Sequence, residues 1–324
     1  MIIIVIYHSI IFWNDWLEIV PVYPSEILKQ ISLWLNSLHI YAFVLVSRYL
    51  FYYLRSEKEK YDKFFPFVIN KFKRLIVPYI FVSVIYVVPI YCLFFDNDIV
   101  TIFDKFGLGI SPSQLWFLLM LFLLFMIFYP LSKFFAKHTF VGVVIVLVIY
   151  ILGLVCGKFT PNIFNIWTAC TYVPVFLVGF KLRQCGTNYI RKIPGLIWLI
   201  LDVGLFVMVQ YLAKYDSFMF KLLGLGFDFI LHIIGAIMSF LVLQKLADKA
   251  KWQDSILFDF IAKQSMPIYL LHQQVIYFFI FWLNGLVNPY INASINFIGA
   301  MVVSIIISGT LMRFKLTRFL IGEK

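Results

Sequence analysis

The stretch Thr139–Cys156, TFVGVVIVLVIYILGLVC, contains no charged side chain. An apolar run of about this length can cross the hydrocarbon core of a bilayer as a helix. Comparable runs recur along the 324 residues, of which 63% are hydrophobic and only 13% are charged. Soluble domains carry about 25% charged residues, so a soluble enzyme with a single anchor is excluded. The sequence therefore predicts an all-α integral membrane protein.

Apolar runs and the polar breaks between them predict one polytopic bundle of about ten transmembrane helices, forming a single domain over 1–324. The predicted helices cover residues 1–13, 32–54, 75–95, 115–134, 138–156, 166–183, 194–213, 219–246, 264–287 and 294–314. The first run is short for a span, and no basic segment precedes it. We therefore expect the start of the first helix to lie upstream of Met1.

The basic residues predict the orientation of the bundle. The chain has a net charge of +11, but its Lys and Arg residues lie in short clusters between apolar runs, which disfavours a nucleic-acid surface. Most of them fall in alternate segments, near 55–74, 133–137, 181–192, 245–263 and 313–324. Because cytoplasmic loops are enriched in Lys and Arg, both termini are predicted to be cytoplasmic. The four cysteines form no CxxC pair, so neither a metal site nor a disulfide framework is predicted.

Ionisable side chains inside predicted helices are candidates for chemistry, because each costs roughly 2.5–3.5 kcal/mol at the centre of a membrane helix. They are His8, Arg48, Asp202, Asp228, His232 and His272. The imidazole of His8 lies among apolar neighbours, where it can accept a proton near neutral pH. A hydrogen bond across helices explains His8 equally well, so the residues alone leave both interpretations open.

Two pairs and one tryptophan have competing structural interpretations. Asp228 and His232 are four residues apart on one helical face, which suits a proton relay or, as we favour, a structural contact. Lys71 and Arg74 are three apart and suit a phosphate clamp, although spacing alone favours a membrane anchor. Trp116 lies near a predicted interface, where indole rings are common, so spacing alone gives it no functional weight.

Five stretches in register resemble the acyltransferase-3 family of membrane proteins. They are Ile4–Ser9 (IVIYHS), the second-helix pattern Leu38–Phe43 with Ser47–Leu50, Lys71–Tyr79 (KFKRLIVPY), Gln114–Leu118 (QLWFL) and Pro267–His272 (PIYLLH). The resemblance covers nearly the whole chain. It departs from the family at Lys71, where arginine is usual, and at Arg48, where glycine is usual. The basic residue that usually precedes the first histidine by about ten positions would lie before Met1.

The resemblance implies an enzyme that moves an acyl group, expected to be acetyl, from cytoplasmic acyl-CoA to a sugar hydroxyl. The acceptor would be a lipid-linked or surface polysaccharide, and the enzyme a multi-pass protein of the bacterial cytoplasmic membrane. His8 would act as general base or as a transient acyl carrier. Lys71, Arg74 and Lys73 would bind the phosphates of acyl-CoA, which is a donor substrate and not a bound cofactor.

Further residues are candidates for substrate binding or for structure: His39, Ser47, Arg48, Trp116, His272, Asp228 and His232. The expected partners are acyl-CoA, the sugar acceptor and the bilayer, without nucleic acid, and the oligomeric state is left open. A polysaccharide transporter or flippase is the alternative function, although no paired Gly or Pro interruptions mark two halves. A non-catalytic partner in polysaccharide assembly is a third possibility.

Overall fold

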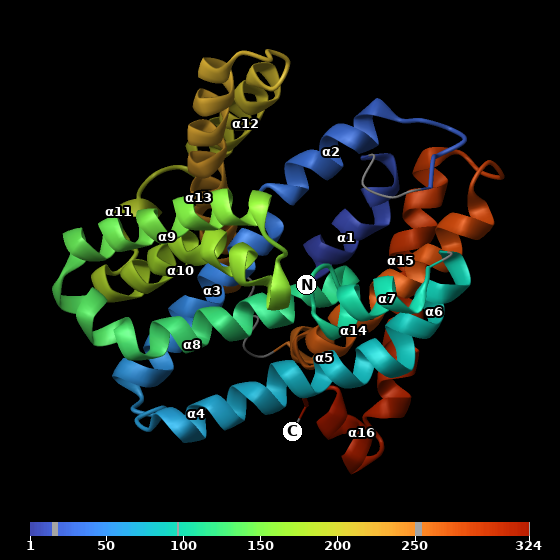
Figure 1. Cartoon of the computed structure of the whole chain (residues 1–324), viewed down its shortest axis with the longest axis horizontal. Helices are drawn as coiled ribbons and strands as arrows, with labels where there is room; N and C mark the ends of the chain where they lie inside the picture. Colours follow the sequence, from blue (N-terminus) through green and yellow to red (C-terminus); the bar gives the residue numbers. More distant parts are fainter. Residues whose placement is uncertain (15–18, 96, 250–254, 324) are drawn as a thin grey trace. The chain divides into compact units, whose positions relative to one another are not determined.

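The computed structural model describes residues 1–14, 19–95, 97–249 and 255–323. All regular elements in these ranges are helices (Figure 1). Within the same ranges, nine helices are long and apolar enough to cross a membrane, and the shorter helix Ile2–Trp13 is also apolar. Helices suit this role because they satisfy their backbone hydrogen bonds internally, where lipid offers no partner. The prediction of an all-α polytopic membrane protein is confirmed.

The chain groups into two compact units, each built from separated segments. The first unit comprises residues 1–29, 61–173 and 259–324, and the second comprises 30–60 and 174–258. Each unit is described by itself below. Whether the whole chain acts as a single domain stays a prediction.

The first unit contains the N-terminal helix and the C-terminal helix pair. Its helices are α1 (Ile2–Ile10), α4 (Phe64–Lys71), α5 (Val77–Val82), α6 (Val88–Phe94), α7 (Ile99–Ile102), α8 (Trp116–Lys137), α9 (Thr139–Phe159), the start of α10 (Ile166–Cys185), most of α14 (Ile256–Leu283), α15 (Pro289–Leu311) and α16 (Lys315–Leu320). The π-helical segments Phe72–Ile76 and Ser83–Val87 join α4, α5 and α6 into one helical run. Short 3-10 turns precede α8 and α10.

The second unit is built around α3 and α13, which pack against each other. Its helices are most of α2 (Glu26–Asn36), α3 (His39–Tyr52), the remainder of α10, α11 (Asn188–Arg191), α12 (Gly195–Leu212) and α13 (Phe218–Lys249). The π-helical turn Tyr53–Glu57 continues α3. The long helices α12 and α13 also pack along each other.

Several helix boundaries differ from the prediction. The predicted helix 32–54 is two helices, α2 and α3, separated by a turn in which the Ser37 hydroxyl donates to the Trp34 carbonyl at 2.7 Å. The predicted cytoplasmic loop 55–74 is helical from Phe64 onward. That segment is amphipathic, so its long basic side chains can extend from a helix toward water. Lys71, Lys73 and Arg74 lie on this helix, as the spacing of Lys71 and Arg74 predicted, although the helix begins before the predicted bound of residue 75.

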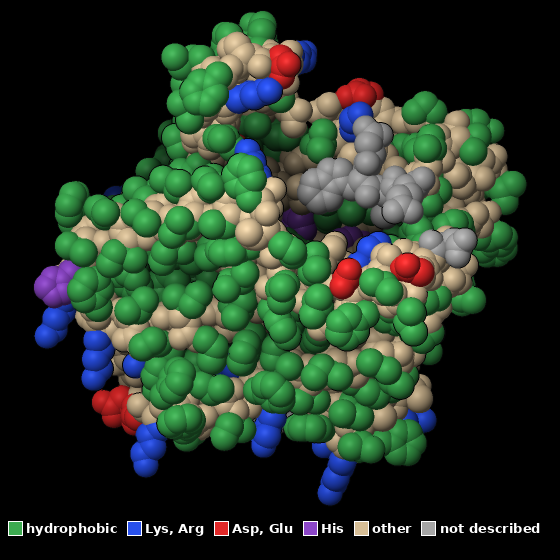
Figure 2. Space-filling model, viewed as in Figure 1, with side chains coloured by type: hydrophobic (Ala, Val, Ile, Leu, Met, Phe, Trp, Pro, Cys, Tyr) green, Lys and Arg blue, Asp and Glu red, His purple; other side chains and the backbone are tan. Residues whose placement is uncertain are grey.

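Arg74 and the basic residues of α16 lie toward one end of α15. Figure 2 shows Lys and Arg side chains along the edge of the view where Figure 1 places α4 and α16. Helix α16 follows directly on the last turn of α15, and Gly322 behind it packs against the backbone of Arg74. At about 1.5 Å per residue, the 23 residues of α15 separate this basic end from Pro289 by roughly 34 Å. The cytoplasmic orientation of this end stays a prediction.

Candidate active site

The first unit brings together two histidines that are far apart in the sequence. His8 in α1 and His272 in α14 have ring centroids 4.9 Å apart, and the ring planes meet at 63° in an edge-to-face arrangement. Tyr7 packs edge-on against His8 at 5.0 Å. His8 is half-buried, whereas His272 is completely buried. The contact places two imidazoles, each able to accept or donate a proton, side by side inside a membrane bundle. A histidine that served only in packing would not need a second imidazole next to it.

Hydrogen bonds fix the tautomer of His272. Its Nδ1 lies 2.9 Å from the backbone carbonyl oxygens of both Ile268 and Tyr269. Carbonyl oxygens only accept, so Nδ1 carries a proton and donates it. In the neutral ring, Nε2 then presents its lone pair, and this buried atom has no hydrogen-bond partner among the described residues. His272 therefore offers a fixed proton acceptor next to His8.

A buried polar network holds the segment of α14 that carries His272. The amide of Gln114 donates to the Leu270 carbonyl at 3.0 Å and to Gln274 Oε1 at 2.6 Å. In return, the Tyr269 hydroxyl donates to the Gln114 carbonyl. The Tyr86 hydroxyl donates to the Leu271 carbonyl at 3.0 Å. The Gln114–Leu118 and Pro267–His272 motifs are thus joined by hydrogen bonds that set the position of His272.

Helix α15 positions the other histidine. The Asn296 amide donates to the backbone carbonyl of Ser9 at 3.1 Å, one residue after His8. Asn296 is completely buried, and its Oδ1 has no hydrogen-bond partner among the described residues. The Ser9 hydroxyl donates back to Val5 along α1 at 2.7 Å. Packing of α1 on α15 therefore sets the depth and rotation of His8.

The predicted phosphate-binding cations differ in their surroundings. The Lys71 ammonium lies 3.6 Å from the ring centroid of Phe125 in α8, and 5.6 Å from that of Phe67. A cation over an aromatic face is stabilised by the ring quadrupole. Lys73 and Arg74 lie in the π-helical segment that follows, and both are exposed. Of the three cations, Lys73 and Arg74 are therefore the ones that are open to an anionic ligand.

Trp116 begins α8 directly after Gln114 and Leu115. Its ring is half-buried and lies 5.9 Å from that of Tyr172 in α10. The neighbouring Phe117 packs on Tyr269 at 5.9 Å. Trp116 thus lies beside the network that holds His272, and no described contact joins it to either histidine of the pair.

Arg48 in the second unit is buried in an aromatic cage. Its guanidinium lies 4.9, 5.2 and 4.6 Å from the ring centroids of Phe51, Phe176 and Phe180. Gly179 allows this close packing, because a side chain there would meet the α3 backbone at Leu45. The cage explains how a cation is accommodated where the family usually has glycine. Ser47, its neighbour in α3, is half-buried.

The remaining candidates also lie in the second unit. His232 Nδ1 lies 3.5 Å from Asp228 Oδ2, and the His232 ring stacks on Tyr41 at 3.8 Å. His39 donates from Nδ1 to the Leu35 carbonyl at 2.7 Å, one turn back along the chain. These contacts suit the structural interpretation of Asp228 and His232. Among the residues that the structure describes, no three His, Cys, Asp or Glu side chains are grouped to hold a metal ion.

Four polar residues that hold the histidine pair were not predicted as site residues: Gln114, Tyr86, Gln274 and Asn296. Each is a polar residue in an apolar stretch, which is the signal that would have drawn attention to them. Asn292, Asn296, Ser304 and Ser308 also recur at multiples of four on one buried face of α15. Polar residues at this spacing lie on one side of a helix, so they indicate contact with protein rather than with lipid.

Comparison with known proteins shows the family of the chain. The chain matches no curated protein and no solved structure. A family model described as an acyltransferase domain matches residues 1–313, which is nearly the entire chain. That model covers both histidines of the pair, the network behind His272 and the exposed cations. The chain belongs to the acyltransferase-3 family and is a membrane acyltransferase.

Proposed function

We propose that the protein is an O-acyltransferase that moves an acetyl group from acyl-CoA on the cytoplasmic side to a sugar hydroxyl on a lipid-linked or surface polysaccharide. We further propose that it works in the bacterial cytoplasmic membrane. The observation that carries this proposal is the contact between His8 and His272, at a centroid distance of 4.9 Å, in a chain of an acyltransferase family. Acyl transfer to a hydroxyl needs a general base that accepts the hydroxyl proton, and His8 beside a second, buried imidazole can supply one.

In the proposed reaction, His8 removes the proton from the sugar hydroxyl as its oxygen attacks the thioester carbonyl. The carbon–sulfur bond then breaks, and His8 returns the proton to the departing thiolate. The products are the sugar ester and CoA with a free thiol. His272 acts as a positioning residue, because its ring packs edge-to-face against His8 at a centroid distance of 4.9 Å and its own Nδ1 proton is committed to two carbonyls. It thereby stabilises a protonated His8 during the transfer.

The donor is proposed to bind at the basic end of the first unit. The exposed side chains of Arg74 and Lys73 would contact the CoA phosphates, since guanidinium and ammonium groups bind phosphate with charge-assisted hydrogen bonds. Lys71, packed on Phe125, would support the same surface. Asn296, which marks the level of His8, lies seven residues after the start of α15 and fifteen before its end. The thioester of the bound donor would therefore have to reach roughly 22 Å along α15, from the phosphates at the basic end to the level of His8.

The test is transfer of radiolabelled acetyl from acetyl-CoA to host glycan in membranes that contain the full chain. We expect label in the glycan with the unchanged protein and at least a hundredfold less with His8→Ala, as expected for loss of a general base. His138→Ala is the matched control, because His138 is an exposed residue between α8 and α9. Equal labelling by His8→Ala and His138→Ala would overturn the proposal. Movement of glycan across the membrane that depends on the chain, with no labelled acetyl in the glycan, would instead indicate a transporter.

A further inference from the structure

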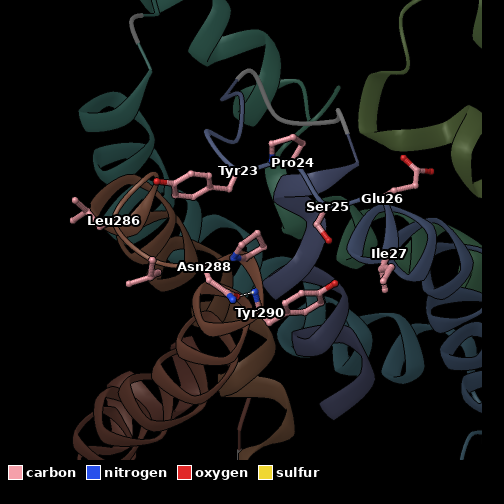
Figure 3. Close-up of a pocket in the computed structure, with 10 residues that line it drawn as sticks. Tyr23, Pro24, Ser25, Glu26, Ile27, Leu286, Asn288 and Tyr290 are labelled. Carbon is pink, nitrogen blue, oxygen red and sulfur yellow. Dashed lines mark hydrogen bonds between the residues drawn. The ribbon is translucent and has the colours of Figure 1, made fainter.

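A pocket lies at the end of the first unit where α15 begins, opposite its basic end. It has a volume of about 690 Å³, and two segments line it, residues 23–27 and residues 286–290. Figure 3 shows the side chains of these two segments around the pocket. Val22 donates its backbone N–H to the Asn284 side chain at 2.9 Å, which holds the segments together. This volume is within the usual range of ligand sites, about 300–1,000 Å³.

The lining residues suit an uncharged ligand that is rich in hydroxyl groups. Tyr23 and Tyr290 line the pocket, and each leaves 48% of its surface exposed. Ser25, Glu26 and Asn288 add hydroxyl, carboxylate and amide groups. The ten described lining residues include no Lys or Arg, so the pocket is unsuited to the phosphates of CoA. Aromatic faces combined with amide and carboxylate groups are what a sugar ring needs, because it has apolar C–H faces and a polar rim.

Asparagines recur between the level of this pocket and the level of His8. Asn288 lines the pocket as the N-cap of α15, and Asn292 and Asn296 lie four residues apart on one face of that helix. Asn292 and Asn296 are 2% and 0% exposed, and the Oδ1 atom of each has no hydrogen-bond partner among the described residues. Buried amides on this face indicate that α15 contacts protein here, and α1 is one of the helices that pack on it. Asn296 bonds the residue next to His8, about 12 Å along the helix from Asn288.

We propose that this pocket is part of the acceptor site, and that it binds one sugar unit of an oligosaccharide acceptor at the end of α15 that lies nearer to His8. This inference rests on the proposed function, because it names the acceptor side of that reaction. The Trp13 indole donates to the Tyr23 carbonyl at 3.1 Å, so the pocket wall is tied to the end of the apolar segment that carries His8. An acceptor of two or more sugar units is then bound better than a single sugar.

The test measures binding of three neutral probes, maltotriose, cellotriose and chitotriose, to the purified full chain in detergent by saturation-transfer NMR. We expect at least one trisaccharide to bind more tightly than its monosaccharide. Tyr290→Ala should weaken that binding about tenfold through loss of ring stacking, whereas Tyr290→Phe should keep most of it. Tyr189→Ala is the matched control, because Tyr189 is 82% exposed and belongs to the second unit. Both tyrosines are exposed enough for the alanine variants to fold.

The outcomes separate this inference from the proposed function. Absence of binding by all three trisaccharides, or equal weakening by Tyr290→Ala and Tyr189→Ala, would overturn the acceptor site. Acetyl-CoA hydrolysis without acceptor reports the His8 chemistry independently of the pocket, and the control Tyr189→Ala should leave it unchanged. Trisaccharide binding that depends on Tyr290, in a protein that transfers no acetyl to any glycan, would support the sugar site and refute the proposed reaction.

Discussion

Replacing Gln114 with leucine removes the amide that fixes the His272 segment. The variant loses three buried hydrogen bonds: Gln114 donates to the Leu270 carbonyl at 3.0 Å and to Gln274 Oε1 at 2.6 Å, and Gln274 donates back to Gln114 Oε1 at 3.3 Å. It also loses the part-buried hydrogen bond from the Ser113 hydroxyl at 2.8 Å. Each buried bond is worth about 1 kcal/mol net, and the stranded amide of buried Gln274 adds a desolvation cost of similar size. We therefore expect Gln114→Leu to lower the free energy of unfolding by about 3–4 kcal/mol. We also expect kcat for acetyl transfer to fall about tenfold or more while KM for acetyl-CoA stays unchanged.

Thermal unfolding in detergent and steady-state transfer kinetics measure the two effects. The double variant Gln114→Leu with Gln274→Leu should regain much of the lost stability, because no polar partner is then stranded. Gln210→Leu, at a half-buried position in α12, is the matched control and should change neither quantity. The reasoning is refuted if Gln114→Leu behaves like Gln210→Leu, or if the double variant is less stable than the single one.

Three further variants test other contacts. Arg74→Gln should raise KM for acetyl-CoA about tenfold without changing kcat, since it removes a charge-assisted contact to phosphate; an unchanged KM would place the donor elsewhere. Arg48→Ala should lower the free energy of unfolding by about 2 kcal/mol, because the buried cation–π contacts are lost. Thermal unfolding measures this effect, and an unchanged melting temperature would argue against the aromatic cage. Trp34→Phe should cost about 1–3 kcal/mol in the same assay, because buried Asp202 loses the indole donor at 2.7 Å, and equal stability would show that water replaces it.

The all-α class and the long apolar spans could be predicted from the sequence, because lipid demands long apolar runs with internally bonded backbones. The start of the helix at Phe64 could not be predicted. The basic run up to residue 74 was placed before a helix that begins at residue 75, although a longer helix that packs Lys71 on an aromatic ring accommodates the same charges. Hydropathy alone does not distinguish a basic loop from a basic helical turn at a membrane surface.

The histidine pair shows what sequence patterns can and cannot supply for the site. Motif resemblance selected His8 and His272 separately, since each ends a recognisable segment. Their contact required the tertiary structure, because 263 residues separate them in the chain. The roles of Gln114 and Asn296 could not be predicted for the same reason. The role of a buried amide depends on the carbonyl to which it donates, and that partner is known only from the tertiary structure. The spacing of Asp228 and His232 placed them together correctly, because both lie on one helix.

The most direct test of the central claim is acetyl transfer by His272 variants in the presence of an unchanged His8. His272→Ala removes the imidazole that packs against His8, and His272→Gln retains a polar group that can accept a hydrogen bond. The account predicts that His272→Ala lowers kcat by about a hundredfold and alters the pH dependence of kcat, since the neighbour that stabilises protonated His8 is gone, while His272→Gln keeps part of the rate. Unchanged kcat and an unchanged pH profile in a folded His272→Ala protein would contradict a functional histidine pair.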